Sequence, residues 1–390
     1  MSTTERPRSR PPLRPPTESD FSHRLRGAVV TARVGTWLGV CFLIAFVTGL
    51  ISHYAQEPNQ PIPFPTSPAW GYRVTQGLHI ITGTAAVPLL LVKLWSVYPK
   101  LFAVPPKRAR ELAIEVAERA SIAVLVAAAI FQLVSGLQNI AHWYTWPFSF
   151  RSVHYAVGWL VTGALLLHIA VKLPVIRGAY ATPVRDDEPA SPGSLDRRGL
   201  LRATWAATAV AVLATAGTTV PWLRRVSVLG VRSGDGPQGL PVNRSARAAG
   251  VTSRATSGRY TLEVVAGDRT VSLTRDDLLA MTQRTESLPI ACVEGWSASA
   301  VWTGVRVRDL LDLVDAPRNS DVRVVSLQQR GAFGITHLPG NFADDDRTLL
   351  ALALHGEPLA LDHGYPARLI APNRPGVLQT KWVTRLEVTA

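Results

Sequence analysis

The chain has 390 residues, of which 47% are hydrophobic and 18% are charged, and its formal net charge at pH 7 is +13. The length allows two or more domains, and the scarcity of charged residues is typical of a membrane protein. Basic residues collect in alternate connections between apolar segments and do not interleave with aromatic residues, so we expect no nucleic-acid partner. The two cysteines, Cys41 and Cys292, lie in segments of different character, which excludes a disulfide framework or a CxxC metal site.

Five apolar segments are long enough to cross a bilayer, which takes roughly 20 residues. We predict a transmembrane helix in each, at residues 34–54, 74–97, 120–143, 153–173 and 200–223. Basic residues are concentrated before the first segment and after the second and fourth. By the positive-inside rule, the N-terminus is cytoplasmic and everything after the fifth segment is extracytoplasmic. The sequence therefore predicts a multi-pass protein of the cell membrane.

In chain order we expect a basic cytoplasmic tail (1–32), a four-helix membrane domain (33–178), a cytoplasmic linker (179–199), a fifth transmembrane helix (200–223), a second linker (224–257) and a last domain (258–390). The stretch "DRRGLLR" at the start of the fifth helix resembles a twin-arginine export signal. Such a signal would allow the last domain to cross the membrane folded, with a cofactor already bound. Alternatively, Arg197 and Arg198 are ordinary positive-inside residues.

Histidines inside the apolar segments are candidate functional residues, because ionisable side chains are costly in a membrane. His79 lies early in the second segment, and His154 and His168 lie 14 residues apart in the fourth. That spacing puts both rings on one side of a helix at different depths. His79 and His154 are at compatible depths to hold one haem iron between two imidazoles, and the arrangement resembles membrane b-type cytochromes.

A second, inner haem is less well supported by the sequence. In b-type cytochrome anchors the first helix often carries a histidine just before a tryptophan, and Thr36 stands there. His53, His142 and His168 are further haem candidates, without an obvious partner. The alternative for every one of these histidines is a hydrogen bond to a neighbouring helix or a place at the membrane interface.

The last part of the chain has the pattern of a mixed α+β domain of about 135 residues, large enough for its own core. Residues 259–274 predict a hairpin that turns at Gly267 and Asp268, followed by a helix capped by Thr274. We further expect helices at 305–314 and at 344–359, the latter begun by acids and stopped by Gly356. Strands are expected at 321–327, 365–372 and 381–389.

Cys292 follows a strand and precedes a glycine turn in the stretch "LPIACVEGWSASAVWTG". A buried structural cysteine would be inert. A nucleophile would need a nearby histidine or helix N-terminus to lower its pKa. A thiolate ligand would hold a soft or transition metal. Its position alone does not choose among these roles.

Two stretches, residues 290–313 and 354–388, resemble the molybdopterin-binding domain of the sulfite oxidase family, which includes bacterial methionine-sulfoxide reductases. The resemblance implies that Cys292 is the thiolate ligand of molybdenum, with Glu294 and Trp296 as catalytic candidates beside it. A phosphate is well matched by arginine, lysine and backbone N–H groups. The residues implied to bind the pterin and its phosphate are His363, Arg368, Gln379, Thr380 and Lys381.

Sulfite oxidases follow this cysteine with an arginine-containing stretch, whereas here it is followed by Val293, Glu294, Gly295 and Trp296. An anionic substrate would be poorly matched to Glu294, so a neutral sulfoxide or N-oxide is expected. We therefore predict a membrane-bound molybdopterin oxidoreductase that transfers an oxygen atom, with electron relay through b-type haem and the quinone pool or another carrier as electron partner. The alternatives are a sulfite-oxidising enzyme, a cofactor-binding module without catalysis, and a thiol enzyme that acts through Cys292.

Overall fold

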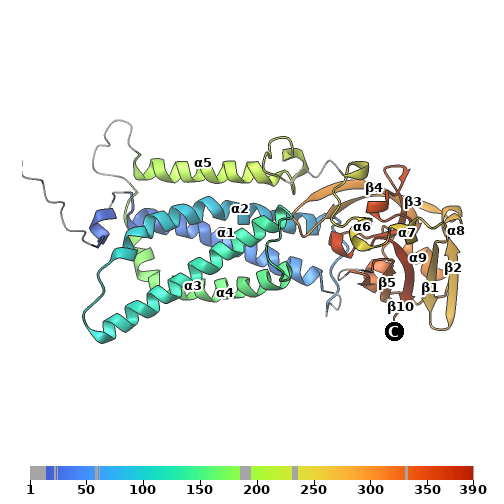
Figure 1. Cartoon of the computed structure of the whole chain (residues 1–390), viewed down its shortest axis with the longest axis horizontal. Coiled ribbons are helices and arrows are strands. Elements are labelled where there is room, and N and C mark those ends of the chain that lie inside the picture. Colours follow the sequence, from blue (N-terminus) through green and yellow to red (C-terminus); the bar gives the residue numbers. More distant parts are fainter. Residues whose placement is uncertain are drawn as a thin grey trace, which may run out of the picture.

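The computed structural model of the chain describes residues 15–21, 23, 25–57, 60, 62–184, 195–230, 236–329 and 333–389. Residues 1–14 of the predicted basic tail, 185–194 of the predicted cytoplasmic linker and 231–235 of the second linker lie outside this set. A bundle of long helices forms one part of the molecule, and a strand-rich domain lies at one end of it (Figure 1).

The described residues include five helices that are long and apolar enough to cross a membrane, which confirms the predicted number. They are α1 (Ala28–Ala55), α2 (Gly71–Val97), α3 (Ala109–Ile140), α4 (Phe150–Ala181) and α5 (Arg197–Ala216). α3 begins earlier than predicted because its polar first turns carry ion pairs, such as Arg119 Nε to Glu115 Oε1 at 2.7 Å. α5 ends earlier than predicted, shortly before Pro221, which cannot continue a helix.

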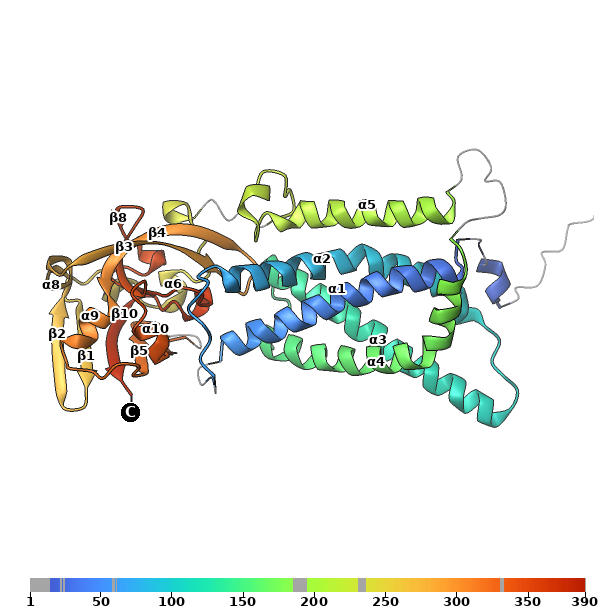
Figure 2. The same cartoon turned by 180° about the vertical axis from the view of Figure 1, so that it is seen from behind.

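The helices run along a common direction, and α5 lies beside α2 in both views (Figures 1 and 2). Short 3-10 helices at Glu18–Phe21 and Tyr98–Phe102 pack together at the end of the bundle away from the strand-rich domain, with the Phe21 and Phe102 rings 4.5 Å apart. The beginning of α1 and the C-terminal domain therefore lie at opposite ends of the bundle (Figure 2).

The C-terminal domain is built on two sheets. The first has the order β2-β1-β10-β5-β6 and the second the order β3-β4-β7-β8, with β9 also paired to β7. Only β1 and β10 pair in parallel among the described strands. Buried side chains of both sheets, such as Leu262 and Leu386 from the first and Val305 and Leu350 from the second, form the main core. The strands are β1 (Thr261–Ala266), β2 (Arg269–Thr274), β3 (Gln283–Ala291), β4 (Ser297–Arg306), β5 (Val322–Ser326), β6 (Ile335–Leu338), β7 (Leu349–Leu354), β8 (Glu357–Pro358), β9 (Arg368–Ile370) and β10 (Val383–Val388).

Several predicted local elements of this domain are present. β1 and β2 form the predicted hairpin, turning at Gly267 with a φ of +55°. Thr274 caps α8 (Arg275–Ala280) in a capping box with Asp277, and α9 (Val307–Asp312) follows β4. The strands predicted near the C-terminus are β9 and β10.

The helix predicted at 344–359 is wrong. The segment forms β7 and β8, which turn at His355 and Gly356, both with positive φ. β7 is paired on both edges, to β4 and β9, and nearly all its residues are buried. Both faces of this strand are therefore apolar, and the alternation of polar and apolar residues that marks a half-buried strand is absent. Such a run fits a buried strand as well as a helix. The acids before it bond to arginines instead, as Asp345 does to Arg347 at 2.7 Å.

Part of the predicted second linker is folded onto the domain. Residues 237–239 form a 3-10 helix, followed by α6 (Ala246–Ala249) and α7 (Thr252–Ala255). Ala246, Ala249 and Val251 are buried in one cluster with Trp382. The small and polar residues of this stretch resemble a linker, but several of its apolar residues, such as Ala246, Ala249 and Val251, are buried against the domain.

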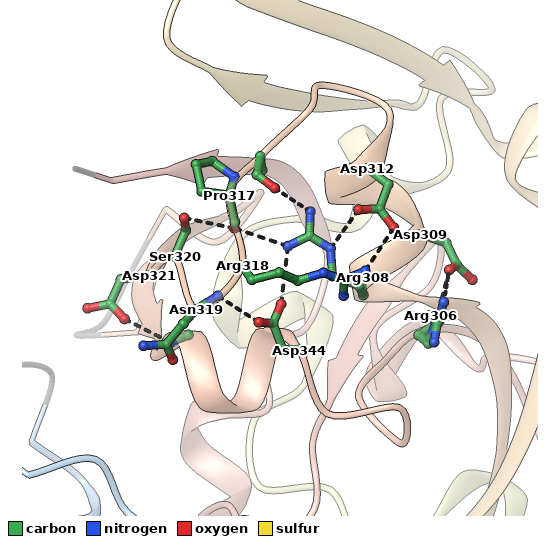
Figure 3. Close-up of polar contacts among 12 residues, drawn as sticks. Arg306, Arg308, Asp309, Asp312, Pro317, Arg318, Asn319, Ser320, Asp321 and Asp344 are labelled. Atoms are coloured by element: carbon green, nitrogen blue, oxygen red, sulfur yellow. Dashed lines mark hydrogen bonds and ion pairs between the residues drawn. The ribbon is translucent and has the colours of Figure 1, made fainter.

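A fully buried arginine, Arg308, lies on α9, whose apolar residues belong to the main core of the C-terminal domain (Figure 3). It donates to the carboxylates of Asp312 (2.9 Å) and Asp344 (3.1 Å) and to the carbonyls of Ala316 (2.8 Å) and Pro317 (3.2 Å). Because its charge is paired and its donors are used, Arg308 is a structural residue.

Candidate functional site

Cys292 opens the tight turn between β3 and β4. The turn is closed by hydrogen bonds from Cys292 N to Trp296 O (2.9 Å) and from Gly295 N to Cys292 O (3.0 Å), and Gly295 has a φ of +89°. A positive φ of this kind favours glycine. The thiol itself has no exposed surface. The β3–β4 hairpin therefore holds a single buried sulfur at its tip.

Glu294 lies directly against this sulfur. Its Oε2 accepts hydrogen bonds from Cys292 Sγ (3.5 Å) and Trp296 Nε1 (3.1 Å), and only 17% of its side chain is exposed. Burial, together with the nearby carboxylate, raises the pKa of the Cys292 thiol well above its usual range. A thiol in this state is a poor nucleophile, whereas metal binding would displace its proton.

The structure brings the predicted pterin-binding residues together beside Cys292, and all five are buried: His363, Arg368, Gln379, Thr380 and Lys381. Arg368 on β9 lies with its guanidinium 5.3 Å from the centre of the Trp302 ring. Lys381, just before β10, donates to the carbonyls of Asp362 (2.8 Å) and Arg244 (2.9 Å). The Nε2 of His363 bonds to the carbonyl of Pro237 (2.6 Å), which fixes the residues before α6 to the site.

Carboxylates act on the cations of this cluster without forming ion pairs with them, as Asp362 and Glu294 act on Lys381. Burial lowers the pKa of Arg368 to about 9, and burial and then Arg368 lower the pKa of Lys381 well below its usual range. Burial also lowers the pKa of Arg374, five residues before Gln379, to about 9. Within the described part of the chain, none of these three cations forms an ion pair with a carboxylate, in contrast to Arg308.

Several polar atoms of the cluster also lack a hydrogen-bond partner although they are buried. They are Arg368 Nε, Arg374 Nε, Trp302 Nε1 and Gln379 Oε1. Unpaired buried cations and donors are costly, so they are expected to meet an anionic ligand. The residues present fit a pterin phosphate and a metal on Cys292. Arg374 was not predicted from the sequence, because nothing in "PNRPG" distinguishes a buried arginine from an exposed one.

The helical bundle contains a second candidate site, formed by His79 of α2 and His154 of α4. Their ring centroids lie 6.2 Å apart, with an angle of 69° between the planes. The Nδ1 of His79 is 2.8 Å from the carbonyl of Ala45, and the Nδ1 of His154 is 3.1 Å from the hydroxyl of Ser135. With Nδ1 engaged in both rings, Nε2 is the nitrogen that each ring has left for a metal.

Glycines of two further helices lie against these rings. A Cβ on Gly49 of α1 would lie 3.0 Å from His79 Cε1, and one on Gly136 of α3 would lie 3.7 Å from His154 Cε1. All four helices of the first part of the bundle thus contribute to the His79–His154 site. Two imidazoles on facing helices, oriented by bonds at Nδ1 and flanked by small residues, fit a b-type haem.

The remaining histidines are placed differently. His53 stacks on Tyr155, with ring centroids 3.8 Å apart, and its Nε2 is 3.5 Å from Glu57. His168 lies on α4 beyond His154, and no ring contact within the described residues joins it to another histidine. His142 lies outside the helices, in the connection between α3 and α4, and its Nε2 is 3.2 Å from Glu294 Oε2. This hydrogen bond raises the pKa of His142.

The Cys292 turn and the start of β4 contact the ends of α2 and α3. Asn139 Nδ2 of α3 donates to Val293 O (2.9 Å), and Arg73 Nε of α2 donates to Ser297 Oγ (2.5 Å). A Cβ on Gly295 would lie 3.0 Å from Ile80 Cδ1. These contacts join residues far apart in the chain, and no sequence pattern pointed to them.

Comparison with known families assigns both parts of the chain. Residues 249–390 match the oxidoreductase molybdopterin binding domain, and residues 36–218 match prokaryotic cytochrome b561. Both resemblances inferred from the sequence motifs are confirmed, and with them Mo-molybdopterin and b-type haem as cofactors. The second match covers α2 to α5 and α1 from residue 36 onward, so the chain is a multi-pass membrane protein.

Individual relatives cover only parts of the chain. Mitochondrial sulfite oxidase of Drosophila melanogaster is 29% identical over an alignment of 155 residues that covers 33% of this chain and 27% of that protein. The uncharacterized oxidoreductase YuiH of Bacillus subtilis is 28% identical over 123 residues, 31% of this chain and 61% of that protein. YedZ1 of Azospira oryzae, named "Putative protein-methionine-sulfoxide reductase subunit", is 32% identical over 116 residues, 30% of this chain and 43% of that protein. The chain thus spans less than two thirds of each of these relatives.

Proposed function

Because residues 249–390 form a molybdopterin-binding oxidoreductase domain of the sulfite oxidase family and residues 36–218 a cytochrome b561-type membrane domain, we propose that the chain is a membrane-bound enzyme for oxygen-atom transfer. The observation that carries this proposal is the cluster of unpaired buried cations beside the buried thiol of Cys292. When bound, Mo-molybdopterin would supply the oxygen-atom transfer chemistry, and haem would supply single-electron transfer.

Each residue of the site has a role in this proposal. Cys292 would hold the metal as a thiolate. Arg368, Lys381 and Arg374 would receive the negative charge of the cofactor, and Gln379 and Thr380 lie between Arg374 and Lys381 in the sequence. His363 holds the segment before α6 against the site through Pro237. In the membrane domain, His79 and His154 hold the haem iron through Nε2.

The substrate that fits best is a neutral oxide such as a sulfoxide. The Glu294 carboxylate lies 3.5 Å from the Cys292 sulfur, where it would repel an anion such as sulfite. Trp296 donates to the same carboxylate and places an apolar ring beside Glu294. The name of the Azospira oryzae relative points to the same substrate class. The carboxylate is also the reason to prefer a sulfoxide over the sulfite-oxidising alternative.

The membrane orientation in this proposal follows the distribution of basic residues. Lys100, Arg108 and Arg198 lie in connections that the positive-inside rule assigns to the cytoplasm. The molybdopterin domain lies at one end of the bundle (Figure 1), and the proposal places that end outside the cytoplasm. Export through the twin-arginine route would deliver that domain with its cofactor bound. The quinone pool is the proposed electron partner. The double substitution Arg197→Lys and Arg198→Lys is therefore expected to prevent the cofactor-loaded domain from reaching the outer side of the membrane.

The decisive experiment is metal analysis of the purified full-length chain together with a reduced-minus-oxidised visible spectrum. We expect molybdenum and a b-type haem spectrum in the unmodified chain. Cys292→Ser should lose molybdenum and keep haem, whereas the matched control Cys41→Ser should keep both. A chain without molybdenum whose activity is abolished by alkylation of Cys292 would instead be a thiol enzyme. A chain that binds both cofactors but turns over neither sulfoxides nor sulfite would be a cofactor-binding module.

A further inference from the structure

We propose that the membrane domain completes the molybdenum site: the connection between α3 and α4 supplies His142 as a positioning residue that holds Glu294 beside Cys292. The inference rests on the proposed function, because it gives Glu294 its place next to a metal ligand. It goes beyond that function in assigning a role to a residue outside the molybdopterin domain, 152 positions before Glu294 in the sequence.

The geometry of the Glu294 carboxylate is the first observation. A single oxygen, Oε2, lies 3.1 Å from Trp296 Nε1, 3.2 Å from His142 Nε2 and 3.5 Å from Cys292 Sγ. Two of these three contacts come from the turn itself, and the third comes from the membrane domain. A carboxylate facing a metal-bound thiolate would be repelled by it, and an imidazole donor on the same oxygen offsets that cost.

The connection is shaped to present this imidazole. α3 ends at Ile140, and His142 has a φ of +52°, a left-handed conformation that is uncommon for a residue with a side chain. Hydrogen bonds from His142 N to Asn139 O (3.2 Å) and from Trp143 N to Gln138 O (2.9 Å) close the end of the helix around it. The backbone thus turns sharply where the ring meets Glu294.

Asn139, one helical turn earlier, holds the neighbouring residue of the turn. Its Nδ2 donates to Val293 O (2.9 Å), and its Oδ1 accepts from Tyr144 Oη (2.9 Å). Asn139 is buried and uses both ends of its amide. The last turn of α3 and the connection after it therefore hold the Val293 carbonyl and the Glu294 carboxylate together, so the position of the Cys292 turn depends on the docked membrane domain.

The test compares His142→Ala and His142→Gln in the cofactor-loaded full-length chain. The readouts are molybdenum content, the electron paramagnetic resonance spectrum of Mo(V), and its midpoint potential. We expect His142→Ala to keep the haem spectrum, to shift the Mo(V) spectrum and potential, and to lower dimethyl sulfoxide turnover roughly 10- to 100-fold, as loss of a residue that orients a metal site does. The glutamine side-chain amide can donate to Glu294, so His142→Gln should restore most of the Mo(V) spectrum.

The control is Glu57→Gln, which removes the charge of the carboxylate that pairs with His53 and Arg151 at this end of the bundle. Within the described residues, no ion pair of Glu57 reaches the Cys292 turn. Its Mo(V) spectrum should equal that of the unmodified chain. A molybdenum-loaded His142→Ala protein with an unchanged Mo(V) spectrum and potential overturns the inference and leaves the proposed function standing. If the alanine variant loses molybdenum, a glutamine variant that fails to regain it overturns the inference. Absence of molybdenum from the unmodified chain overturns the proposed function and this inference with it.

Discussion

Ile80 of α2 lies directly against Gly295 of the Cys292 turn, so close that a Cβ on the glycine would be 3.0 Å from Ile80 Cδ1. Ile80 follows His79, the proposed haem ligand, and Gly295 lies three residues after Cys292, the proposed molybdenum ligand. Two segments that each carry a candidate metal ligand are therefore in van der Waals contact. This contact places the backbone of the proposed haem ligand next to the turn that carries the proposed molybdenum ligand.

The first prediction concerns this contact. In Gly295→Ala, the new methyl group must displace Ile80, and an alanine at a φ of +89° costs about 1–2 kcal/mol. We expect the turn to move off the helices, so that amide hydrogen exchange in residues 139–145 becomes faster. The control Gly267→Ala also has a positive φ, +55°, but open space around the new Cβ. Equal exchange in the two variants would mean that Gly295 matters only for its own backbone.

The second prediction concerns room for the haem. A Cβ on Gly49 would lie 3.0 Å from His79 Cε1 and 3.3 Å from its Nδ1, so Gly49→Ala should rotate the imidazole away from its bond to Ala45. We expect less haem per chain, measured as b-type absorbance relative to protein. Gly39→Ala is the matched control, because Gly39 is on the same helix with nothing within 4 Å of a Cβ. Haem loss in both variants would point to α1 as a whole and not to the His79 site.

The parts of this architecture that depend on local pattern could be predicted from the sequence. Apolar length identified the five long helices, and depth in the membrane paired His79 with His154, whose rings lie 6.2 Å apart. Motif resemblance named the buried residues around Cys292. In each case the physical cause lies within one segment or in a fixed order of short segments.

The parts that failed depend on contacts between distant segments. The run 349–354 was predicted as a helix because nothing in it shows that β4 and β9 cover both its edges. His142 was considered only as a haem candidate, because its neighbour Glu294 is brought to it by the docking of two domains. Neither the spacing of apolar residues nor a short motif shows which distant segments come into contact.

The third prediction compares the stability that two arginines contribute, one in a buried network and one in a partly exposed ion pair. Arg308→Met removes a fully buried guanidinium that bonds to Asp312, Asp344 and two carbonyls (Figure 3). We expect the free energy of unfolding to fall by about 3 kcal/mol, since breaking such a network leaves buried acceptors unpaired. Arg323→Met breaks a partly exposed pair with Glu387 and should cost at most about 1 kcal/mol. Denaturant unfolding of the full-length chain measures both values, and similar losses would contradict the structural role of Arg308.

The fourth prediction is that His363 makes the free energy of unfolding depend on pH. Burial, and then Arg368, lower the pKa of His363 from 6.5 to about 4 in the folded chain. Between these two values the unfolded state binds a proton that the folded state does not, so stability falls as the pH is lowered through this window and this contribution levels off below it. His363→Gln can keep a donor to the Pro237 carbonyl but cannot titrate. Its unfolding free energy should therefore decline less steeply from pH 6.5 to 4 than that of the unmodified chain. Parallel curves would show that the imidazole gains a proton equally easily in both states, and that the cations around it do not act on it.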